Sequence, residues 1–385
     1  MFIDLTEEQK ALRERLRAYL QTVVTAEQRL VLRQERHGPV HREVVARLGR
    51  DGWLGLGFPE RYGGSGDDPM AQQIFVNEAA RADVPLPAVT LQTVAPTLLA
   101  FGTEAQKDFF LPRILAGEVH FAIGYTEPEA GTDLAALRTR AVRDGDGYLV
   151  NGQKTFTTGA HDAEYLWLAC RTDPDAPRHK GLSVLIVDTS DPGYSWTPII
   201  TCDGAHHVNA VYLSDVRVPE AMRVGPENGG WRLLTTQLNH ERVMLGPAGR
   251  VGALWARVQA WATEKPGVRD QPDVRRALAR AYACLRVNEL LNWQVAGSEP
   301  AGVADASATK VFSSEWVLRI GQELEEAVGR HGDPSDPQTA ALVSWLDLQA
   351  KRNLVLTFGG GVNEIQRELI ATAGLGLPRV PRQVG

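Results

Sequence analysis

The hydrophobic period of the sequence changes twice along the chain, and this limits the fold more than any other feature. Apolar residues recur at helical spacing up to about residue 118 and again from about residue 229. Between these stretches the sequence alternates in steps of two, as in "RAVRDGDGYLVNGQKTFTTG". The two periods belong to helices and strands respectively. We therefore expect an α+β protein with an N-terminal helical domain (1–118), a middle β-domain (119–228) and a C-terminal helical bundle (229–385).

The same periods predict individual elements within each domain. Thr6 and Gln9 have the spacing of a capping box at the start of a first helix. Further helices are expected at 41–50, 71–82, 103–115, 230–246, 272–296, 308–329 and 339–357, with a last one after Asn363. The dipeptides Asp146-Gly147 and Asn151-Gly152 predict turns. Further strands are expected at 180–190 and 209–219.

Composition excludes several classes of function. The net charge is −6, from 41 basic and 47 acidic side chains, so a nucleic-acid partner is not expected. The longest apolar runs, such as "VLIV" at 184–187, are too short to span a membrane. The start of the chain is amphipathic and charged rather than a signal peptide, and the three cysteines are scattered. We expect a cytoplasmic protein, and no metal ligands at His206-His207.

Two short segments carry the chemical information in the β-domain. The first is "FAIGYTEPEAGTD" (121–133), which combines hydroxyl side chains with Pro and Gly in an irregular run. The second is "VNGQKTFTTG" (150–159), which puts Phe156 and Thr158 on one face of a strand. Taken alone, the first is compatible with any structured loop, and the second with ordinary packing. No Rossmann fingerprint and no Walker A sequence is present.

Together these segments resemble the acyl-CoA dehydrogenase family, and the resemblance covers essentially the whole chain. The motifs that carry it are "GWLGLGFPERYGG" (52–64), "TEPEAGTD" (126–133), "NGQKTFTTG" (151–159), "VRVPEAMRVGPENGGW" (216–231), "ASATKVF" (306–312) and "NEIQR" (363–367). The resemblance implies a middle β-barrel domain and a C-terminal four-helix bundle. It also implies non-covalently bound FAD and α,β-dehydrogenation of an acyl-CoA thioester, with an electron-transfer flavoprotein as the acceptor.

The resemblance also assigns roles to individual residues. Thr158 would form a hydrogen bond near flavin N5, and Phe156 would pack on the isoalloxazine, where many members have Trp. The cofactor-binding set that the resemblance implies is Tyr125, Thr126, Gly131, Thr132, Phe156, Thr158, Val362 and Glu364. The substrate-binding set is Thr132, Arg242, Gly360 and Gly361.

The catalytic base is expected at an unusual place. In many members a catalytic Glu stands at the position of Gly360, within "FGGGVNEIQR". A second family position lies on the first bundle helix, where "LNHERVML" provides Glu241 before Arg242. Apolar neighbours at helical spacing, Leu238, Met244 and Leu245, should raise the pKa of Glu241. Glu241 is therefore the predicted base, and the missing side chain at Gly360 would make room for a bulky acyl group.

The family elements that bind the neighbouring subunit's FAD are missing. Residues 260–273 contain no Arg-x-x-Phe, and Glu326 stands where a Gln is expected, before Gly329-Arg330 instead of Gly-Gly. With "LNHERV" and "LTFGGGVNEIQR", this pattern resembles the actinobacterial steroid side-chain dehydrogenases, which are α2β2 heterotetramers acting on cholesterol-derived CoA thioesters. The sequence thus predicts a base-bearing subunit that pairs with a homologous subunit. A homomeric enzyme for branched acyl-CoA or carrier-protein thioesters, and a non-catalytic structural subunit, remain as alternatives.

Overall fold

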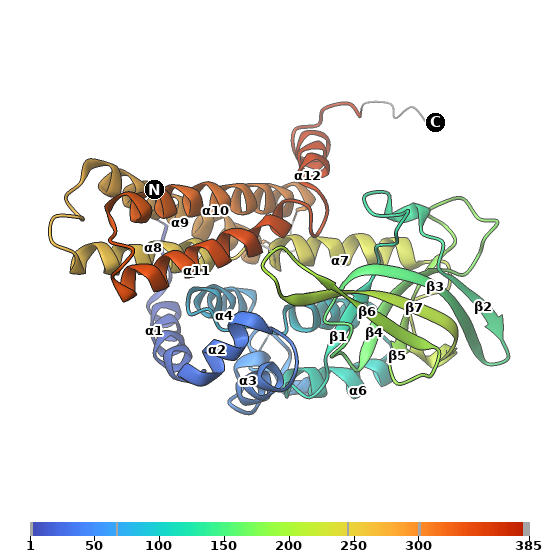
Figure 1. Cartoon of the computed structure of the whole chain (residues 1–385). Coiled ribbons are helices and arrows are strands. Elements are labelled where there is room, and N and C mark those ends of the chain that lie inside the picture. Colours follow the sequence, from blue (N-terminus) through green and yellow to red (C-terminus); the bar gives the residue numbers. More distant parts are fainter. Residues whose placement is uncertain (1–2, 67, 245, 299–301, 380–385) are drawn as a thin grey trace. The chain divides into compact units, whose positions relative to one another are not determined.

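The chain divides into two compact units that are each assembled from separated stretches of sequence. The computed structural model describes residues 3–66, 68–244, 246–298 and 302–379, and for 240–244 it describes the backbone only. The first unit contains Met1–Gln21, Pro69–Val84 and Arg242–Gly385, and the second contains Thr22–Asp68 and Pro85–Glu241 (Figure 1). The α+β class is confirmed, with N-terminal helices, a middle sheet and C-terminal helices.

The first unit is built from long helices. Its elements are α1 (Glu7–Thr22), α4 (Pro69–Arg81), α8 (Gly249–Glu264), α9 (Pro272–Ala296), α10 (Val303–His331), α11 (Pro337–Asn353) and α12 (Asn363–Leu369). The buried apolar cluster draws on α8, α9, α10 and α11, for example through Val258, Ala281, Ile320 and Leu346. These four helices form the predicted bundle around one shared core. The capping box before α1 is also confirmed, because Thr6 and Gln9 exchange their backbone N–H and side-chain bonds at 3.0 and 3.2 Å.

The second unit combines shorter helices with one sheet. The helices are α2 (Ala26–Gln34), α3 (Pro39–Arg50), α5 (Ala95–Phe101), α6 (Glu104–Leu115) and α7 (Gly230–Met244), the last of which runs on into the first unit. The strands are β1 (Phe121–Gly124), β2 (Arg140–Asp144), β3 (Gly147–Thr158), β4 (Tyr165–Arg171), β5 (Leu182–Asp188), β6 (Tyr194–Ile200), β7 (His206–Pro219) and β8 (Arg223–Val224).

The sheet has the order β6-β7-β3-β2-β4-β5-β8, and β1 pairs with β4. Most neighbours are antiparallel, whereas β1 runs parallel to β4. Strands β4 and β5 are almost completely buried, and β6 at the edge is largely exposed. Strand β6 was not predicted because an exposed edge strand needs no alternation of apolar and polar residues, and it carries Pro198 as edge strands often do.

The two predicted turns in the middle domain need correction. The first connection is made by Gly145 and Asp146, one residue earlier than predicted, because Gly147 already pairs with Pro219 in the sheet. The second prediction is wrong: Asn151-Gly152 lies inside β3. A side chain at Gly152 would overlap Thr139, so the glycine serves a close approach inside the sheet rather than a turn.

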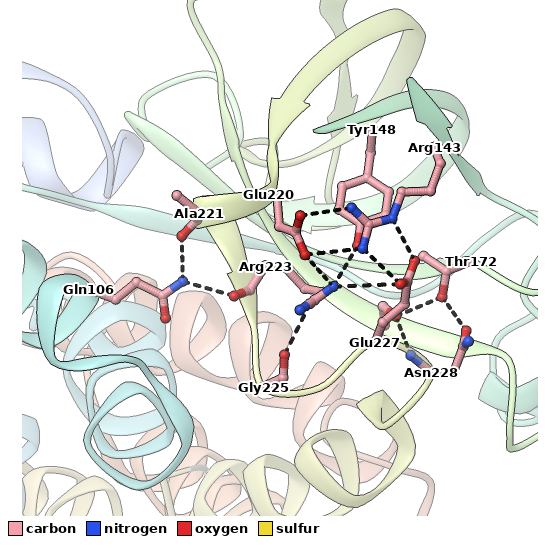
Figure 2. A network of polar contacts seen from close by, with 11 residues as sticks. Gln106, Arg143, Tyr148, Thr172, Glu220, Ala221, Arg223, Gly225, Glu227 and Asn228 are labelled. Carbon is pink, nitrogen blue, oxygen red and sulfur yellow. Dashed lines mark hydrogen bonds and ion pairs between the residues drawn. The ribbon is translucent and has the colours of Figure 1, made fainter. Parts of the chain in front are cut away.

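A polar network accounts for one of the family-like motifs, residues 216–231. Arg143 on β2 bonds Glu220 and Glu227 from this segment, each at 2.9 Å (Figure 2). Gln106 on α6 donates its side-chain amide to two main-chain carbonyls of the same segment, at 2.8 and 2.9 Å. The motif therefore fastens the end of the sheet to α6 and β2.

The predicted domain boundaries stay a prediction, because the two units cut across the N-terminal helices. Helices α1 and α4 belong to the first unit, and α2, α3, α5 and α6 belong to the second. Among the described residues, no helix combines the length and the apolar character that crossing a membrane requires.

Candidate functional site

A buried ion pair joins the two informative segments of the β-domain. Lys154 on β3 is 0% exposed, and its Nζ lies 2.8 Å from Glu127 Oε1 and 3.1 Å from the Tyr125 carbonyl. The backbone N–H of Thr155 also donates to the Thr126 carbonyl, at 2.9 Å. These bonds hold the loop that contains Thr126 and Thr132 against the strand that contains Phe156 and Thr158. Sequence reasoning missed both partners of this pair.

Both carboxylate oxygens of Glu127 accept hydrogen bonds in this contact between loop and strand. Its two oxygens accept the backbone N–H groups of Arg138 and Thr139 at 2.6 and 2.8 Å, in addition to Lys154. Burial by itself would raise the pKa of Glu127, but Lys154 and these donors bring it below the ordinary value. The carboxylate is therefore ionised at neutral pH, as a partner for a buried ammonium must be.

A break in the β3–β7 ladder turns Phe156 outward. The pairing register shifts between Lys154 and Thr157, and Phe156 in this bulge has a φ of +55°. A left-handed backbone costs a non-glycine residue about 1–2 kcal/mol, so the surrounding sheet must impose it. The ring is 63% exposed, and Thr158 is exposed too, whereas Thr157 between them is buried. The result is an open aromatic surface with a hydroxyl beside it.

The loop across from this surface has its own exposed polar groups. Thr126 is half-buried, while Gly131 and Thr132 are exposed at a tight turn closed by the Glu127 and Ala130 backbone bonds. A side chain at Gly131 would meet only Thr126 Cγ2, at 3.9 Å. Four of the predicted cofactor residues of the second unit thus lie on the C-terminal half of β3 and on the loop bonded to it, with side chains or backbone that are exposed or half-buried: Thr126, Gly131, Thr132 and Thr158, beside the exposed ring of Phe156.

Tyr125 is buried and committed to a different contact. Its hydroxyl donates to Gln237 Oε1, and Trp167 Nε1 donates to the same oxygen at 2.8 Å. Gln237 lies on α7, is 0% exposed, and stands one helical turn before Glu241. Tyr125 therefore anchors α7 to the sheet, and Gln237 is a site residue that the sequence did not reveal.

Glu241 and Arg242 lie in α7, but their side chains fall outside the described residues. The helix is continuous through both positions, as the sequence predicts. The second unit ends at Glu241, and the last segment of the first unit begins at Arg242. The base assignment stays a prediction.

The glycine triplet forms a tight turn in the first unit, between the 3₁₀ turn Leu354–Thr357 and α12. Gly360 and Gly361 have left-handed backbone, with φ of +66° and +92°. A side chain at Gly361 would come within 2.6 Å of Gln366 Nε2. Two successive left-handed residues require glycine, so this turn disfavours a glutamate at residue 360.

A second buried lysine holds this turn in place. Lys310 on α10 is 0% exposed, and its Nζ donates to the carbonyls of Thr357 and Gly361 at 3.2 and 2.7 Å. It also donates to Asn363 Oδ1 at 2.7 Å. The "ASATKVF" motif therefore supplies the clamp for the turn, which the sequence alone did not show.

Two further predicted cofactor residues, Val362 and Glu364, lie next to the glycine turn at the start of α12. Val362 precedes α12 as its N-cap, and its carbonyl accepts the N–H of Gln366 at 3.1 Å. Glu364 is exposed in the first turn of α12. The structure thus gathers Gly360, Gly361, Val362 and Glu364 in the first unit, and the sheet residues in the second.

Two residues of the region where the sequence predicts the loss of the trans FAD-binding elements make contacts within the bundle. Arg330 near the end of α10 pairs with Asp273 at the start of α9, with NH1 2.8 Å from Oδ2. Glu326 accepts a hydrogen bond from Gln322 one turn earlier, at 2.9 Å. Both side chains are bonded within their own bundle.

Comparison with known proteins identifies the family. Three domain models match in order: "Acyl-CoA dehydrogenase, N-terminal domain" at 6–118, the middle domain at 122–216 and the C-terminal domain at 228–375. The chain belongs to the acyl-CoA dehydrogenase family. It is accordingly an oxidoreductase that acts on CH–CH bonds, and members of this family are flavoproteins.

Individual relatives are similar to this chain over almost its full length. Acyl-CoA dehydrogenase FadE29 of Mycobacterium tuberculosis is 64% identical, over 99% of this chain and 100% of that protein. The solved structure named Tcur3481-Tcur3483 steroid ACAD is 48% identical, with a TM-score of 0.91, over 99% and 100% of the two chains. The ChsE4-ChsE5 complex from Mycobacterium tuberculosis is 48% identical with a TM-score of 0.89, over 99% and 100%.

The exposed surface at the end of β3 fits a flavin in this acyl-CoA dehydrogenase. Phe156 offers a flat apolar surface that strained backbone holds outward, and the hydroxyls of Thr158 and Thr132 are exposed as hydrogen-bonding groups. These residues would hold the ring system, and the assignment of Tyr125 to the cofactor stays a prediction.

Proposed function

We propose that this chain is the base-bearing subunit of a heteromeric, FAD-dependent acyl-CoA dehydrogenase for CoA thioesters of bulky, steroid-derived side chains. The observation that carries the proposal is the turn at Gly359–Gly361. Its two left-handed glycines, clamped by Lys310, leave no side chain where many family members have their catalytic glutamate. The base must then come from elsewhere, and Glu241 on α7 is the family's other position for it.

In this proposal the residues of the chain divide the chemistry between them. FAD, when bound, supplies the acceptor for the hydride that leaves the substrate Cβ. Glu241 takes the proton from Cα, and the helix that carries it is anchored through Gln237 and Tyr125. A main-chain N–H of the glycine turn donates to the thioester carbonyl, which favours loss of the α-proton. The small glycines leave room for a branched or polycyclic acyl group.

The partner and the substrate class rest on separate support. Arg330 and Glu326 are bonded within the bundle, so they support a chain that lacks the cofactor contacts given across a subunit interface. Two of the similar solved structures are named as pairs of proteins, and one of them as a steroid ACAD. A homologous subunit would supply the missing Arg and Gln donors, and an electron-transfer flavoprotein would accept the electrons.

The base assignment is tested by Glu241→Gln in the complex with its partner. We expect FAD to remain bound while substrate-dependent bleaching of the flavin slows by about 10²–10⁴-fold. The matched control is Glu8→Gln, an exposed glutamate in α1 that should leave the rate unchanged. Wild-type bleaching rates in Glu241→Gln would contradict the assignment.

The assembly and the substrate are tested by expressing the chain alone and together with a homologous subunit. The proposal expects substoichiometric FAD in the chain alone, full occupancy in the complex, and faster bleaching with a steroid side-chain CoA than with isovaleryl-CoA. Full occupancy in the chain alone would favour a homomeric enzyme. FAD reduction that requires only the partner's residues would indicate a structural subunit.

A further inference from the structure

Histidines gather in the second unit at a distance from any predicted role. His37, just before α3, has its ring 5.4 Å from that of His161 and 5.7 Å from that of His41. His41 in turn contacts His120 at 5.7 Å, and His161 stacks on His206 at 4.0 Å. Buried imidazoles are normally hydrogen-bonded, so the partner of each ring nitrogen shows which histidines are already committed.

His206, His161 and His207 each have one ring nitrogen bonded to a neighbouring side chain. Asn209 donates its Nδ2 to the Thr157 carbonyl at 3.2 Å, which fixes the orientation of the amide. Its Oδ1 therefore accepts from His206 Nε2 at 2.7 Å, and His161 Nδ1 accepts from its Nδ2 at 3.0 Å. His207 Nε2 pairs with Asp203 at 3.0 Å. The Nε2 atoms of His206 and His207 are thus both hydrogen-bonded.

His37 and His41 converge with the carboxylate of Asp162. One donor atom from each lies within 4.8 Å of the other two. His41 is 4% exposed, and its Nδ1 has no hydrogen-bond partner in the part of the chain that the structure describes. A buried nitrogen without a partner calls for an explanation such as an ion.

The carboxylate in this group is already oriented. Asp162 Oδ2 accepts the backbone N–H of Gly38 at 2.8 Å, and Oδ1 accepts Nε of Arg42 at 2.7 Å. Each carboxylate oxygen has two lone pairs, so both can also bind an ion. Such outer-shell bonds commonly hold a ligating carboxylate in position.

We propose that His37, His41 and Asp162 form a binding site for a Zn²⁺ ion. Two imidazoles and one carboxylate are ligands that zinc accepts, with water as the fourth. Ligand bonds of about 2.0–2.2 Å place donor atoms about 3.5 Å apart in a tetrahedron, so small rotations of the imidazoles would close the site. The ion would satisfy the unpartnered nitrogen of His41.

Charge in the surroundings selects the type of ion. Zinc binds imidazole in its neutral form, and the rings of His41 and His37 are buried and half-buried, which disfavours a charged ring. The Arg42 guanidinium opposes a cation, but it is shared by Asp162 and Glu164, so two carboxylates balance it. A site with nitrogen ligands and a neutralised carboxylate disfavours Mg²⁺ and Ca²⁺, which need several oxygen ligands.

The ion would link the segment before α3 to the end of β3. Gly159 follows Thr158 directly, and its N–H donates to the His207 carbonyl at 3.0 Å, while Asp162 N–H donates to the Gly159 carbonyl at 3.0 Å. A bound Zn²⁺ would thus brace the strand end that carries Phe156 and Thr158. The inference does not depend on the substrate or on the partner subunit.

The test uses the full-length protein, freed of metal with a chelator and titrated with Co²⁺ as a coloured substitute for Zn²⁺. We expect one Co²⁺ per chain with a visible d–d spectrum, which Zn²⁺ abolishes by displacement, and a higher melting temperature with Zn²⁺. His37→Gln and His41→Gln should each weaken binding at least about tenfold. The matched control is His179→Gln, an exposed histidine outside the cluster, which should bind like the wild type.

Two results would overturn the zinc site. A wild-type protein that binds neither ion stoichiometrically, or a His37→Gln variant that binds like the wild type, overturns the proposal. Circular dichroism shows whether each variant is folded. Should His41→Gln fail to fold, the partly exposed His37 decides the question by itself.

Discussion

Among the described residues, Lys154 in one unit and Lys310 in the other are completely buried, and their known partners differ. Lys154 pairs with the carboxylate of Glu127 at 2.8 Å, so a full negative charge balances the ammonium. Lys310 has two main-chain carbonyls and the Asn363 amide oxygen as its hydrogen-bond acceptors. Lys154 forms an ion pair that joins β3 to the loop containing Thr126 and Thr132, the two segments predicted to contact the flavin. Lys310 is a cation that the dipoles of the glycine turn stabilise.

This difference determines what each lysine contributes. When one member of a buried ion pair is removed, the other is left as an uncompensated charge in a low-dielectric site. When Lys310 is removed, the carbonyls of Thr357 and Gly361 and the amide oxygen of Asn363 lose a donor, and Gly361 at the surface can turn its carbonyl to water. We therefore expect Lys154 to govern stability, and Lys310 to govern the order of one turn.

The largest effect is expected for Lys154→Met. Loss of the ammonium leaves Glu127 buried and unpaired, so the free energy of unfolding should fall by about 3–5 kcal/mol. Urea unfolding followed by circular dichroism measures this change. The double variant Lys154→Met/Glu127→Gln should recover part of it, and Lys180→Met at an exposed position serves as the control. A single variant as stable as the control would show that the pair contributes nothing.

A smaller effect is expected for Lys310→Met. Three acceptors lose their shared donor, and the free energy of unfolding should fall by about 1–3 kcal/mol. The more specific result is local: amide hydrogen exchange should accelerate across residues 358–362, whereas Lys154→Met should leave this segment unchanged. Unaltered exchange in the turn would refute the clamp.

The stability of the protein in acid should also depend on the Lys154–Glu127 pair. The pKa of Glu127 is below its ordinary value of 4.5, so the folded state holds this proton more weakly than the unfolded chain does. Its stabilising contribution is present above that ordinary value and is lost as the pH falls through the lowered folded pKa. Lys154→Met should therefore have a shallower loss of stability in acid, measured as urea midpoints along a pH series. A Lys154→Met variant with the wild-type slope would contradict this account.

The smallest effect is expected for Arg143→Gln, in the exposed network of Figure 2. Exposed ion pairs are screened by water and salt, so the melting temperature should change little and the change should vanish at high salt. A loss as large as that of Lys154→Met would mean that burial does not separate the two networks.

Much of the fold was readable because apolar periodicity is a local property. The predicted helix at 272–296 coincides with α9, and the change from helical to strand period agrees with the sheet that begins at β1. Signals that depend on partners failed: Asn151-Gly152 has the composition of a turn, but sheet pairing keeps it extended inside β3. Strand β6 was missed because an exposed edge leaves no pattern.

The candidate site divides in the same way. The motifs "TEPEAGTD" and "NGQKTFTTG" contain Glu127 and Lys154, and Lys154 is in phase with buried Val150 on the core face of the strand. That phase was the available signal for a buried lysine, but its partner lies 27 positions away. Gln237 gave no signal, since its role depends on Tyr125 and Trp167 in the sheet.

The sequence by itself determined the order of helical and strand regions, the family motifs, the glycines of the turn and the choice of Glu241 as the expected base. Only the tertiary structure decided which polar side chains are buried and with whom: Lys154 with Glu127, Lys310 with the glycine turn, and His37 and His41 with Asp162. The physical reason is range. Period and turn chemistry act within a few residues, whereas a buried charge is stabilised by groups that sheet register and helix packing bring from distant parts of the chain.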